Sequence, residues 1–587
     1  MSKQTYKVCF CCRRRFKLTV SEAPQEIKAL FGNYSENGVM TSTHLHRFLV
    51  EEQKEDKATI QDAQVIIDNV RPMVVFHKSG LNLEGFFKYL FGDLNPPISP
   101  KLGVHQDMTA PLSHYFIFTG HNSYLTGNQL TSDCSDVPIK HALQKSVRVI
   151  ELDIWPNSSK DNVDVLHGGT MTSPVELIKC LKSIKEHAFS ASEYPVVITL
   201  EDHLTADLQA KTAEMITQTF GDTLFTPDSE CFKELPSPES LKKHVMISTK
   251  PPIVYREAKD ANEDSLKISK DSGDEEAWGK EVPSLKSHSQ KHHDLDDGDD
   301  DEEEDELDDD INKSKKFVAP EYTRIIAIHA GKPKGGLSEA LKVDPNKVRR
   351  LSLSEPQLEK AAIQYGKDIV RFTHKNMLRI YPKGTRITSS NYNPLVGWMH
   401  GAQMVAFNMQ GCGRSLWLMQ GMFRANGGCG YVKKPHFLLN SGPNGEVFDP
   451  KIKLPVKKTL KVTVFMGEGW YYDFKHTHFD QFSPPDFYVR VGIAGVAADT
   501  VMKKTKTLED NWIPAWNEEF EFPLSVPELA LLRIEVHEYD MSEKDDFGGQ
   551  TVLPVWEISE GIRSVPLCNR EGIKYPSVKL LMRFQFI

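Results

Sequence analysis

A run of acidic residues near the middle of the chain limits what the sequence can fold into. The run from Asp294 to Asp310 reads DLDDGDDDEEEDELDDD and contains fourteen acids. It lies in a longer polar stretch, about 258–316, with too few apolar residues to offset the entropy cost of ordering its backbone. We therefore predict a disordered acidic linker over residues 253–319, with a globular portion on each side.

The acidic run also masks the charge of the rest of the chain. The 587 residues carry a formal net charge of −10, so without the fourteen acids of the run the remainder is at +4. A mildly basic folded portion does not repel an anionic membrane or a phosphate. No stretch approaches the roughly 18 apolar residues of a membrane span, and the N-terminus lacks an apolar signal-peptide core. We expect a cytosolic protein whose nine cysteines are reduced.

Three hydrophobic patterns follow one another along the chain. Helical spacing with two helix–loop–helix-like stretches predicts a helical region over 1–106. Short apolar runs alternate with helical stretches in 107–252 and again in 320–440, which predicts an α/β barrel interrupted by the linker. From 441 to 587 the strands alternate without helices between them, which predicts a β-sandwich.

Polar side chains lie at or near the ends of the strands predicted before the linker. These five strands are residues 115–118, 147–155, 163–166, 196–200 and 245–249. The polar residues at or near their ends are His121, Asn122, Glu151, Asp153, His167, Glu201 and Lys250. Each has an ordinary explanation singly, such as a helix cap for Glu201 or a buried imidazole for His167. Together they predict an active site, because α/β barrels build theirs at the carboxyl ends of several strands.

After the linker the same pattern of short strands resumes. The strands predicted there are residues 322–328, 378–381 and 402–408. They would complete the barrel begun before the linker.

The strand-end set contains the ligands of a hard cation. Its oxygen donors are Asn122, Glu151, Asp153 and Glu201. Glu151 and Asp153 are two apart on a strand, so both carboxylates leave the same face. Several protein oxygens favour Ca²⁺ over Mg²⁺, and no Cys or His spacing suggests zinc. His121 and His167 beside such a cation predict phosphoryl chemistry, in which imidazoles exchange protons and the metal offsets phosphate charge.

Several linked motifs resemble the plant type of phosphoinositide-specific phospholipase C. GHNSYLTGNQL, ELDIW, LHGGTMTS and ITLEDH resemble the X region of that family, and LSLSE, LRIYPKGTRITSSNYNP and ANGGCGYVKKP resemble its Y region. The resemblance covers nearly the whole chain. It implies a multidomain protein of α+β and α/β class, with an EF-hand-like helical region, a TIM-type barrel split by the linker, and a C-terminal C2-type sandwich.

The resemblance also implies an activity. This is the calcium-dependent hydrolysis of phosphatidylinositol bisphosphate and related phosphoinositides. The inositol 2-hydroxyl would attack the phosphodiester to release diacylglycerol, and water would then open the cyclic inositol phosphate. The protein would be a signalling phospholipase.

Roles for individual residues follow from the same resemblance. His121 would stabilise the pentacovalent phosphoryl oxygens, His167 would act as general acid and then base, and Glu151 would help to deprotonate the hydroxyl. The implied ligands of the catalytic calcium are Asn122, Glu151, Asp153 and Glu201. The implied headgroup contacts are Lys250, Ser352, Arg379 and Tyr381. Animal members carry a second lysine where this chain has Pro252, a departure that bears on how phosphorylated headgroups are discriminated.

The N-terminal region resembles EF-hands without their calcium chemistry. When Gly38 is aligned with the loop glycine, His44 stands where a bidentate Glu belongs. The early ligand positions are then Asn33, Ser35 and Asn37. The second loop, residues 77–82, has basic residues where acids are needed. We predict two packing units that do not bind calcium.

The C-terminal sandwich resembles a C2-type module. Its implied loop ligands for calcium are Asp486, Asp540 and Asp546, with Asp473 and Asp545 as further candidates. Ile513 stands where animal relatives have Asn, which weakens one loop. Acids clustered at one end suit calcium-bridged binding to anionic lipid. We therefore expect an anionic membrane and a phosphoinositide as partners, no nucleic acid, and a monomer bound peripherally to the inner face of the plasma membrane.

Cysteines near the N-terminus are a candidate lipid anchor. Cys9, Cys11 and Cys12 precede three arginines, a combination typical of an acylated, polybasic tether. Reduced surface cysteines are the alternative, and the sequence leaves the choice open.

Two other functions stay open at this point. A glycerophosphodiester phosphodiesterase would share the barrel, the carboxylates and the histidines, but would need neither the sandwich nor the set Ser352, Arg379 and Tyr381. A non-catalytic, calcium-dependent lipid-binding scaffold would have no use for two proton-transfer groups.

Overall fold

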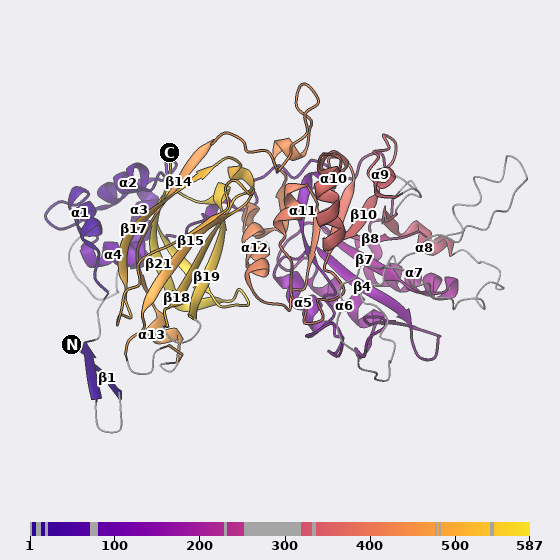
Figure 1. Cartoon of the computed structure of the whole chain (residues 1–587), viewed down its shortest axis with the longest axis horizontal. Coiled ribbons are helices and arrows are strands. Elements are labelled where there is room, and N and C mark those ends of the chain that lie inside the picture. The colour runs from indigo at the N-terminus through magenta and orange to yellow at the C-terminus, as the bar shows by residue number, and fades with distance from the viewer. Residues whose placement is uncertain are drawn as a thin grey trace, which may run out of the picture.

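The structure is a computed structural model that describes most of the chain outside the acidic linker. The described residues are 3–7, 13–17, 21–70, 80–227, 232–251, 319–331, 336–475, 478–479, 483–540 and 545–587. Four features of the sequence analysis lie outside them. These are the linker up to residue 318, the cysteines Cys9, Cys11 and Cys12, Pro252, and positions 77–79 of the second N-terminal loop. Figure 1 shows the helical N-terminal region beside the sandwich, and the barrel on the sandwich's other side.

Four helices form the N-terminal region after a short antiparallel hairpin. The hairpin is β1 (Lys3–Lys7) with β2 (Arg13–Lys17), and the helices are α1 (Gln25–Asn33), α2 (Ser42–Glu51), α3 (Ile60–Val70) and α4 (Leu83–Leu90). Met40 and Leu81 exchange backbone hydrogen bonds of 2.8 and 2.7 Å, so the two interhelical loops pair. Their pairing confirms the EF-hand-like arrangement.

His44 has a structural role in this region. Its Nδ1 accepts from the Thr41 backbone N–H at 3.5 Å, and its own N–H donates to the Thr41 hydroxyl at 3.4 Å. This reciprocal cap begins α2, so the position that an EF-hand gives to its bidentate Glu is used to start a helix. The absence of calcium binding in these loops stays a prediction.

Eight parallel strands form the barrel. In sheet order they are β10 (Arg350–Ser354), β11 (Met377–Tyr381), β12 (Met404–Phe407), β3 (Tyr115–Gly120), β4 (Val149–Pro156), β7 (Val196–Asp202), β8 (Val245–Thr249) and β9 (Ile326–His329). A parallel bridge between Ala330 and Arg350 brings β9 against β10 and nearly closes the ring. Four strands precede the linker and four follow it, which confirms a TIM-type barrel split between its halves.

Helices cover the outside of the barrel (Figure 1). They are α5 (Val137–Gln144), α6 (Leu177–His187), α7 (Ala206–Phe220), α8 (Pro320–Arg324), α9 (Gly336–Ala340), α10 (Glu355–Thr373), α11 (Leu395–Met399) and α12 (Arg414–Met422). The strand predicted over 322–328 is therefore partly wrong, because α8 occupies its first residues and β9 begins only at Ile326. Strand β10, which the sequence analysis did not predict, completes the eight.

Residues 163–166, predicted as one of five strands in series, do not form a barrel strand. Their strand, β5 (Val163–Val165), pairs antiparallel with the end of β4 and with β6 (Val175–Glu176). The turn before it is too short for the crossover of a dozen or more residues that a parallel strand needs. In that turn the Asn157 side chain accepts from the backbone N–H groups of Asp161 and Asn162. The hairpin carries the chain directly to His167.

The C-terminal portion is an antiparallel sandwich. Its sheet order is β16 (Val501–Lys504), β15 (Phe487–Ala494), β18 (Leu531–Glu538), β19 (Asp546–Pro554), β20 (Gly561–Cys568), β21 (Lys574–Phe586), β14 (Lys458–Glu468) and β17 (Ala515–Leu524). A short helix α13 (Trp470–Asp473) follows β14, and β13 (Tyr431–Lys433) pairs antiparallel with β3 of the barrel. This architecture confirms the C2-type sandwich. Short 3₁₀ helices cover 100–102, 112–114, 221–223, 426–428, 436–438, 527–529 and 555–557.

Buried contacts join the sandwich to both of its neighbours. On the N-terminal side, the Gln53 side chain donates to the Ile562 carbonyl at 2.8 Å and accepts from its N–H at 2.6 Å. On the barrel side, Gly421 of α12 lies so close to Val552 that an added Cβ would stand 2.3 Å from its Cγ1. The sandwich is therefore packed directly against both the N-terminal region and the barrel.

A cluster of basic residues lies at the amino end of the barrel strands. Lys434 is buried, and its ammonium donates to the carbonyls of Thr373 (2.7 Å) and Gly401 (3.3 Å). Burial holds the pKa of Lys434 well below its usual value. Burial, and then the nearby Lys434, lower the pKa of His114 and of His374 to about 4. Both imidazoles are therefore neutral in the folded protein near pH 6.

These histidines predict a pH dependence of stability. In the unfolded chain each would take up a proton near its ordinary pKa of about 6.5, whereas in the folded protein it does so only near pH 4. The unfolded state thus binds more protons between those values, and the free energy of unfolding falls as the pH drops through that window. The double variant His114→Gln/His374→Gln should lose less stability there, measured as urea midpoints at pH 7, 6 and 5. Parallel pH curves for the two proteins would contradict this account.

Candidate active site

His121 and Asn122 occupy a tight turn at the carboxyl end of β3. Asn122 has φ of +42°, in the left-handed region that Asn tolerates better than most residues. A Cβ at Gly120 would stand 2.2 Å from the Ser123 hydroxyl, which would have to move to make room for it. The His121 N–H donates to the Phe407 carbonyl of β12 at 2.8 Å. Both His121 and Asn122 are therefore held, buried, at the mouth of the barrel.

Strand register brings three carboxylates together beside this turn. Asp153 of β4 pairs with Glu201 of β7, and Glu151 lies two residues earlier on the same face of β4. One oxygen from each of the three carboxylates lies within 4.8 Å of the others. Across the part of the chain that the structure describes, no other group of three or more acids, histidines or cysteines is this close.

Each carboxylate has a partner among the side chains of the protein. Arg379 donates to Oε1 of Glu151, with both side chains buried. The Tyr124 hydroxyl donates to Asp153 Oδ2 at 2.6 Å, and His203 Nε2 lies 2.9 Å from Glu201 Oε1. Burial, and then the Asp153 carboxylate, raise the pKa of Tyr124 well above its usual value, so the phenol keeps its proton and donates.

The remaining oxygens fit a hard cation. Oε2 of Glu151 and Oδ1 of Asn122 are buried and have no hydrogen-bond partner among the described residues. Burying a carboxylate oxygen without a partner is costly. An all-oxygen donor set with buried, uncompensated acceptors matches the ligands of a hard divalent cation rather than of zinc.

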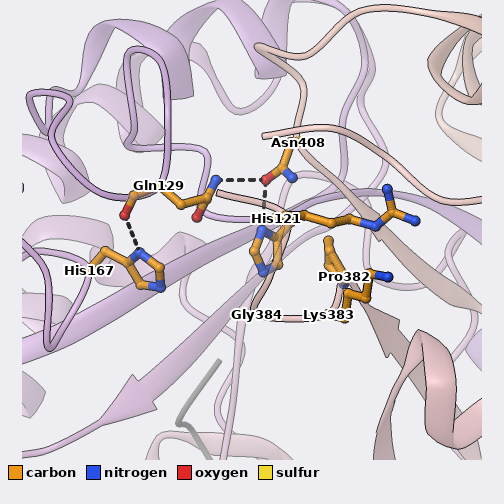
Figure 2. A pocket seen from close by; sticks show the side chains of 8 residues that line it. His121, Gln129, His167, Pro382, Lys383, Gly384 and Asn408 are labelled. Atoms are coloured by element: carbon orange, nitrogen blue, oxygen red, sulfur yellow. Dashed lines mark hydrogen bonds between the residues drawn. The ribbon is translucent and has the colours of Figure 1, made fainter. Parts of the chain in front are cut away.

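Two histidines line a pocket at this end of the barrel (Figure 2), and the hydrogen bonds of their Nδ1 atoms define their tautomers. Nδ1 of His167 lies 2.7 Å from the Gln129 carbonyl, which can only accept, so Nδ1 carries the proton. Nδ1 of His121 lies 2.8 Å from Oδ1 of Asn408, and the same argument applies. In each ring Nε2 is therefore the nitrogen that can exchange a proton with a bound substrate.

The sequence matches known proteins along nearly its whole length. It matches the X domain of phosphatidylinositol-specific phospholipase C over residues 108–251 and the Y domain over 326–437. It matches the C2 domain over 458–565 and the EF-hand-like region of phosphoinositide-specific phospholipase C over 19–94. Phosphoinositide phospholipase C 2 of Arabidopsis thaliana is 70% identical over 590 residues, with 100% of both chains covered.

The chain belongs to the phosphoinositide-specific phospholipase C family. This confirms the resemblance drawn from the motifs. The 1-phosphatidylinositol 4,5-bisphosphate phosphodiesterase delta-3 of Mus musculus is 31% identical, over 95% of this chain and 68% of its own. The crystal structure of L. pealei PLC21 has a TM-score of 0.72 at 25% identity, covering 96% of this chain and 68% of that one.

Three of the four headgroup residues implied by the family lie on neighbouring strands. Ser352 of β10 pairs in register with Arg379 of β11, and the Arg379 guanidinium stands 5.2 Å from the centre of the Tyr381 ring. Lys250 is exposed, directly after β8, and lies two strands away around the ring. The structure thus groups Ser352, Arg379 and Tyr381, and sets Lys250 apart at the rim.

The acids of the C2-type loops gather at one end of the sandwich. The Tyr539 N–H donates to the Asp486 carbonyl at 2.8 Å, and Asp546 begins β19 opposite the end of β18. Asp473 instead accepts from the backbone N–H groups of Ser577 (2.6 Å) and Val578 (3.0 Å).

Asp545 and Ile513 are two further loop positions that contact other parts of the structure. Asp545 accepts from the Tyr488 hydroxyl, while the Asp540 N–H lies 3.4 Å from Asp545 Oδ1. Ile513 packs against the cores of the sandwich and of the N-terminal region. Asp473 and Asp545 therefore stabilise the loops, and calcium binding by Asp486, Asp540 and Asp546 stays a prediction.

Several residues of the site escaped the sequence analysis. Asn408 follows β12 as His121 follows β3, so the rule of polar residues at strand ends could have found it. Tyr124, Gln129 and His203 lie within motifs quoted above, but their positions in those motifs gave no indication of their roles. Their roles depend on hydrogen bonds that form only in the folded chain.

Two adjacent carboxylates provide a matched test of cation binding. Asp202 ends β7 and accepts from the Leu204 N–H (2.9 Å) and from Gln209 Nε2 (2.8 Å), whereas Glu201 belongs to the cluster. Glu201→Gln should weaken calcium binding at the barrel at least about tenfold, measured by titration calorimetry, because it removes a charged ligand. Asp202→Asn should leave this binding unchanged and lower only the thermal unfolding midpoint. Equal loss of binding in both variants would place the cation elsewhere.

Proposed function

We propose that the protein hydrolyses phosphatidylinositol 4,5-bisphosphate and related phosphoinositides to diacylglycerol and inositol phosphate. One observation carries the proposal: two imidazoles of defined tautomer and a buried carboxylate cluster meet at the mouth of a barrel of this family. The substrate class follows from the family and from relatives named as phosphoinositide phospholipases and as a phosphatidylinositol bisphosphate phosphodiesterase.

The chemistry proceeds in two steps. The inositol 2-hydroxyl attacks phosphorus and gives its proton to Glu151, while His167, as an imidazolium, protonates the departing glycerol oxygen from Nε2. His167 then takes a proton from the water that opens the cyclic phosphate. Because Nδ1 of His121 already donates to Asn408, this ring can donate from Nε2 to a phosphoryl oxygen only as an imidazolium. Its positive charge then also offsets the charge of the pentacovalent phosphorus.

The metal of this reaction is calcium. Asn122, Glu151, Asp153 and Glu201 would hold it, and when bound it supplies positive charge that acidifies the 2-hydroxyl and offsets the phosphate. The buried oxygens of Asn122 and Glu151, which have no partner among the described residues, support this assignment. Glu151 can serve as ligand and base because Arg379 occupies only one of its oxygens.

The groups that would bind the headgroup phosphates are cations and hydroxyls on β10, on β11 and directly after β8. Arg379, Ser352 and Lys250 would bind ring phosphates and hydroxyls, and Tyr381 would pack against the ring. Charge-assisted bonds to phosphate are stronger than neutral ones, so bisphosphate headgroups gain most from Arg379.

The substrate lies in a bilayer, so the enzyme must reach one. None of the helices that the structure describes combines the length and apolar character needed to cross a membrane. We propose peripheral binding by a monomer at the inner face of the plasma membrane. Asp486, Asp540 and Asp546 would bridge calcium to anionic lipid. No nucleic acid is a partner.

The two histidines provide the main test of the proposed reaction. His121→Ala and His167→Ala should each lower turnover by about 10² to 10⁴, since each removes a group that donates or transfers a proton. Binding to phosphoinositide vesicles, measured by sedimentation, should stay within twofold of the wild type. A variant with full activity would remove that histidine from the mechanism, and equal loss of binding and turnover would indicate misfolding instead.

Arg379 provides a test of substrate selectivity. Arg379→Ala leaves Glu151 without its partner, so turnover should fall on every substrate. The fall should be at least about tenfold larger on phosphatidylinositol 4,5-bisphosphate than on phosphatidylinositol, because one charge-assisted phosphate contact is also lost. The ratio of the two kcat/KM values is the measure, and an unchanged ratio would refute phosphate recognition by Arg379.

A further inference from the structure

One glutamine connects the two histidines of the barrel mouth. The backbone carbonyl of Gln129 accepts from Nδ1 of His167 at 2.7 Å. Its side-chain Nε2 donates at 3.1 Å to Oδ1 of Asn408, which also accepts from Nδ1 of His121 (Figure 2). Gln129 therefore contacts one imidazole directly and the other through Asn408.

The orientations of the Gln129 and Asn408 side-chain amides follow from nearby carbonyl groups, which can only accept a hydrogen bond. The Ser389 hydroxyl donates to the Gly127 carbonyl at 2.7 Å, so it must accept from Gln129 Nε2, which lies 2.8 Å away. The NH₂ group of Asn408 points to the Ser390 carbonyl at 3.3 Å. With these ends set, Gln129 presents its NH₂ to Asn408, and Asn408 presents its oxygen to His121.

Burial strengthens the hydrogen bonds of this arrangement. Gln129 is 5% exposed, Ser389 1% and Asn408 0%. Hydrogen bonds in such surroundings are stronger than in water, and a buried donor or acceptor that loses its partner is costly. Without the Gln129 donor, the Asn408 amide could turn and present NH₂ to His121, which would then need the other tautomer.

The network spans the two halves of the barrel. Gln129 and both histidines precede the linker, whereas Asn408 and Ser389 follow it. The Gln129 N–H also donates to the Ile387 carbonyl at 2.8 Å. The tautomer of a histidine in the first half is thus set by an amide of the second half.

We propose that Gln129 and Asn408 are positioning residues that together hold the His121 ring with its Nδ1–H toward Asn408 and its Nε2 toward the substrate, with Gln129 acting through Asn408. The proposal rests on the proposed function, since it concerns the residues of the same reaction. Neither side chain needs to touch the substrate. Their contribution belongs to turnover and not to substrate binding, because His121 acts on a phosphate that is already bound only when the ring is held with Nε2 toward it.

A double-mutant cycle tests this dependence. Asn408→Leu preserves volume but removes the acceptor, and Gln129→Met preserves length but removes the donor. Asn408→Asp keeps an oxygen toward His121. Hydrolysis of phosphatidylinositol 4,5-bisphosphate is measured on the full chain at saturating calcium. This excludes losses that act through Asn122, whose amide donates to Gln129 Oε1 at 3.3 Å.

The proposal makes four quantitative statements about these variants. Asn408→Leu should lower kcat by about 10- to 100-fold and Gln129→Met by about tenfold, with KM within twofold of the wild type. The double variant should be no slower than Asn408→Leu by more than about twofold, because Gln129 acts through Asn408. Asn408→Asp should recover most of the loss in kcat. Losses that multiply in the double variant, a loss confined to KM, or no recovery with Asp would each overturn the proposal.

A neighbouring glutamine provides the matched control. Gln410 donates to the same Ser389 hydroxyl (3.4 Å) and to the Gly127 carbonyl (3.3 Å), but not to Asn408 or a histidine. Gln410→Met should retain kcat within about twofold, and a tenfold loss there would overturn the specific role of Gln129. If Asn408→Leu lowers the unfolding midpoint, the cycle is run with Asn408→Ala. A wild-type protein that does not hydrolyse the lipid would refute the proposed function itself, whereas an active wild type with multiplying losses refutes only the network.

Discussion

The candidate site depends on three carboxylates that strand register holds within 4.8 Å of one another. Like charges at this distance in a buried place repel strongly unless protons or cations compensate them. The surrounding residues serve that need, since Arg379, Tyr124 and His203 each approach one carboxylate. Removing one partner of a buried ion pair typically costs about 3–5 kcal/mol. The carboxylates at the barrel mouth and their partners therefore depend on one another for stability, and a bound cation would compensate the remaining charge of the carboxylates.

The site is also where the two halves of the barrel meet. The carboxylates come from β4 and β7, before the linker, and Arg379 comes from β11, after it. The amide of Asn408 reaches back in the same way to His121. Closing the barrel therefore brings the cationic and the acidic side chains of the site together. A long insertion between the two halves of the barrel is therefore compatible with an assembled site, because the contacts that join the halves are also the contacts that bring the site residues together.

Much of the fold was predictable from the pattern of apolar residues along the sequence, and the predictions that were wrong have identifiable causes. Alternating apolar runs and helical stretches indicated the barrel, since each barrel strand is buried on both faces. The pattern could not show that β5 turns back antiparallel, because a short apolar run has the same appearance in a barrel strand and in a hairpin. It also took α8 for the start of β9. Propensity over a few residues is weak evidence, and tertiary packing decides such segments.

The sequence alone identified the candidate residues for the chemistry: the two histidines, the oxygen ligands and the headgroup contacts that we propose all stand at recognisable positions in motifs. It determined this because strand ends and motif spacing are local properties. The tertiary structure alone decided which of these groups act on one another. Arg379 pairs with Glu151 across 228 residues, and Asn408 orients His121 across 287. Such pairs depend on register and ring closure, which are set by burial over the whole barrel and leave no trace in the spacing of residues along the chain.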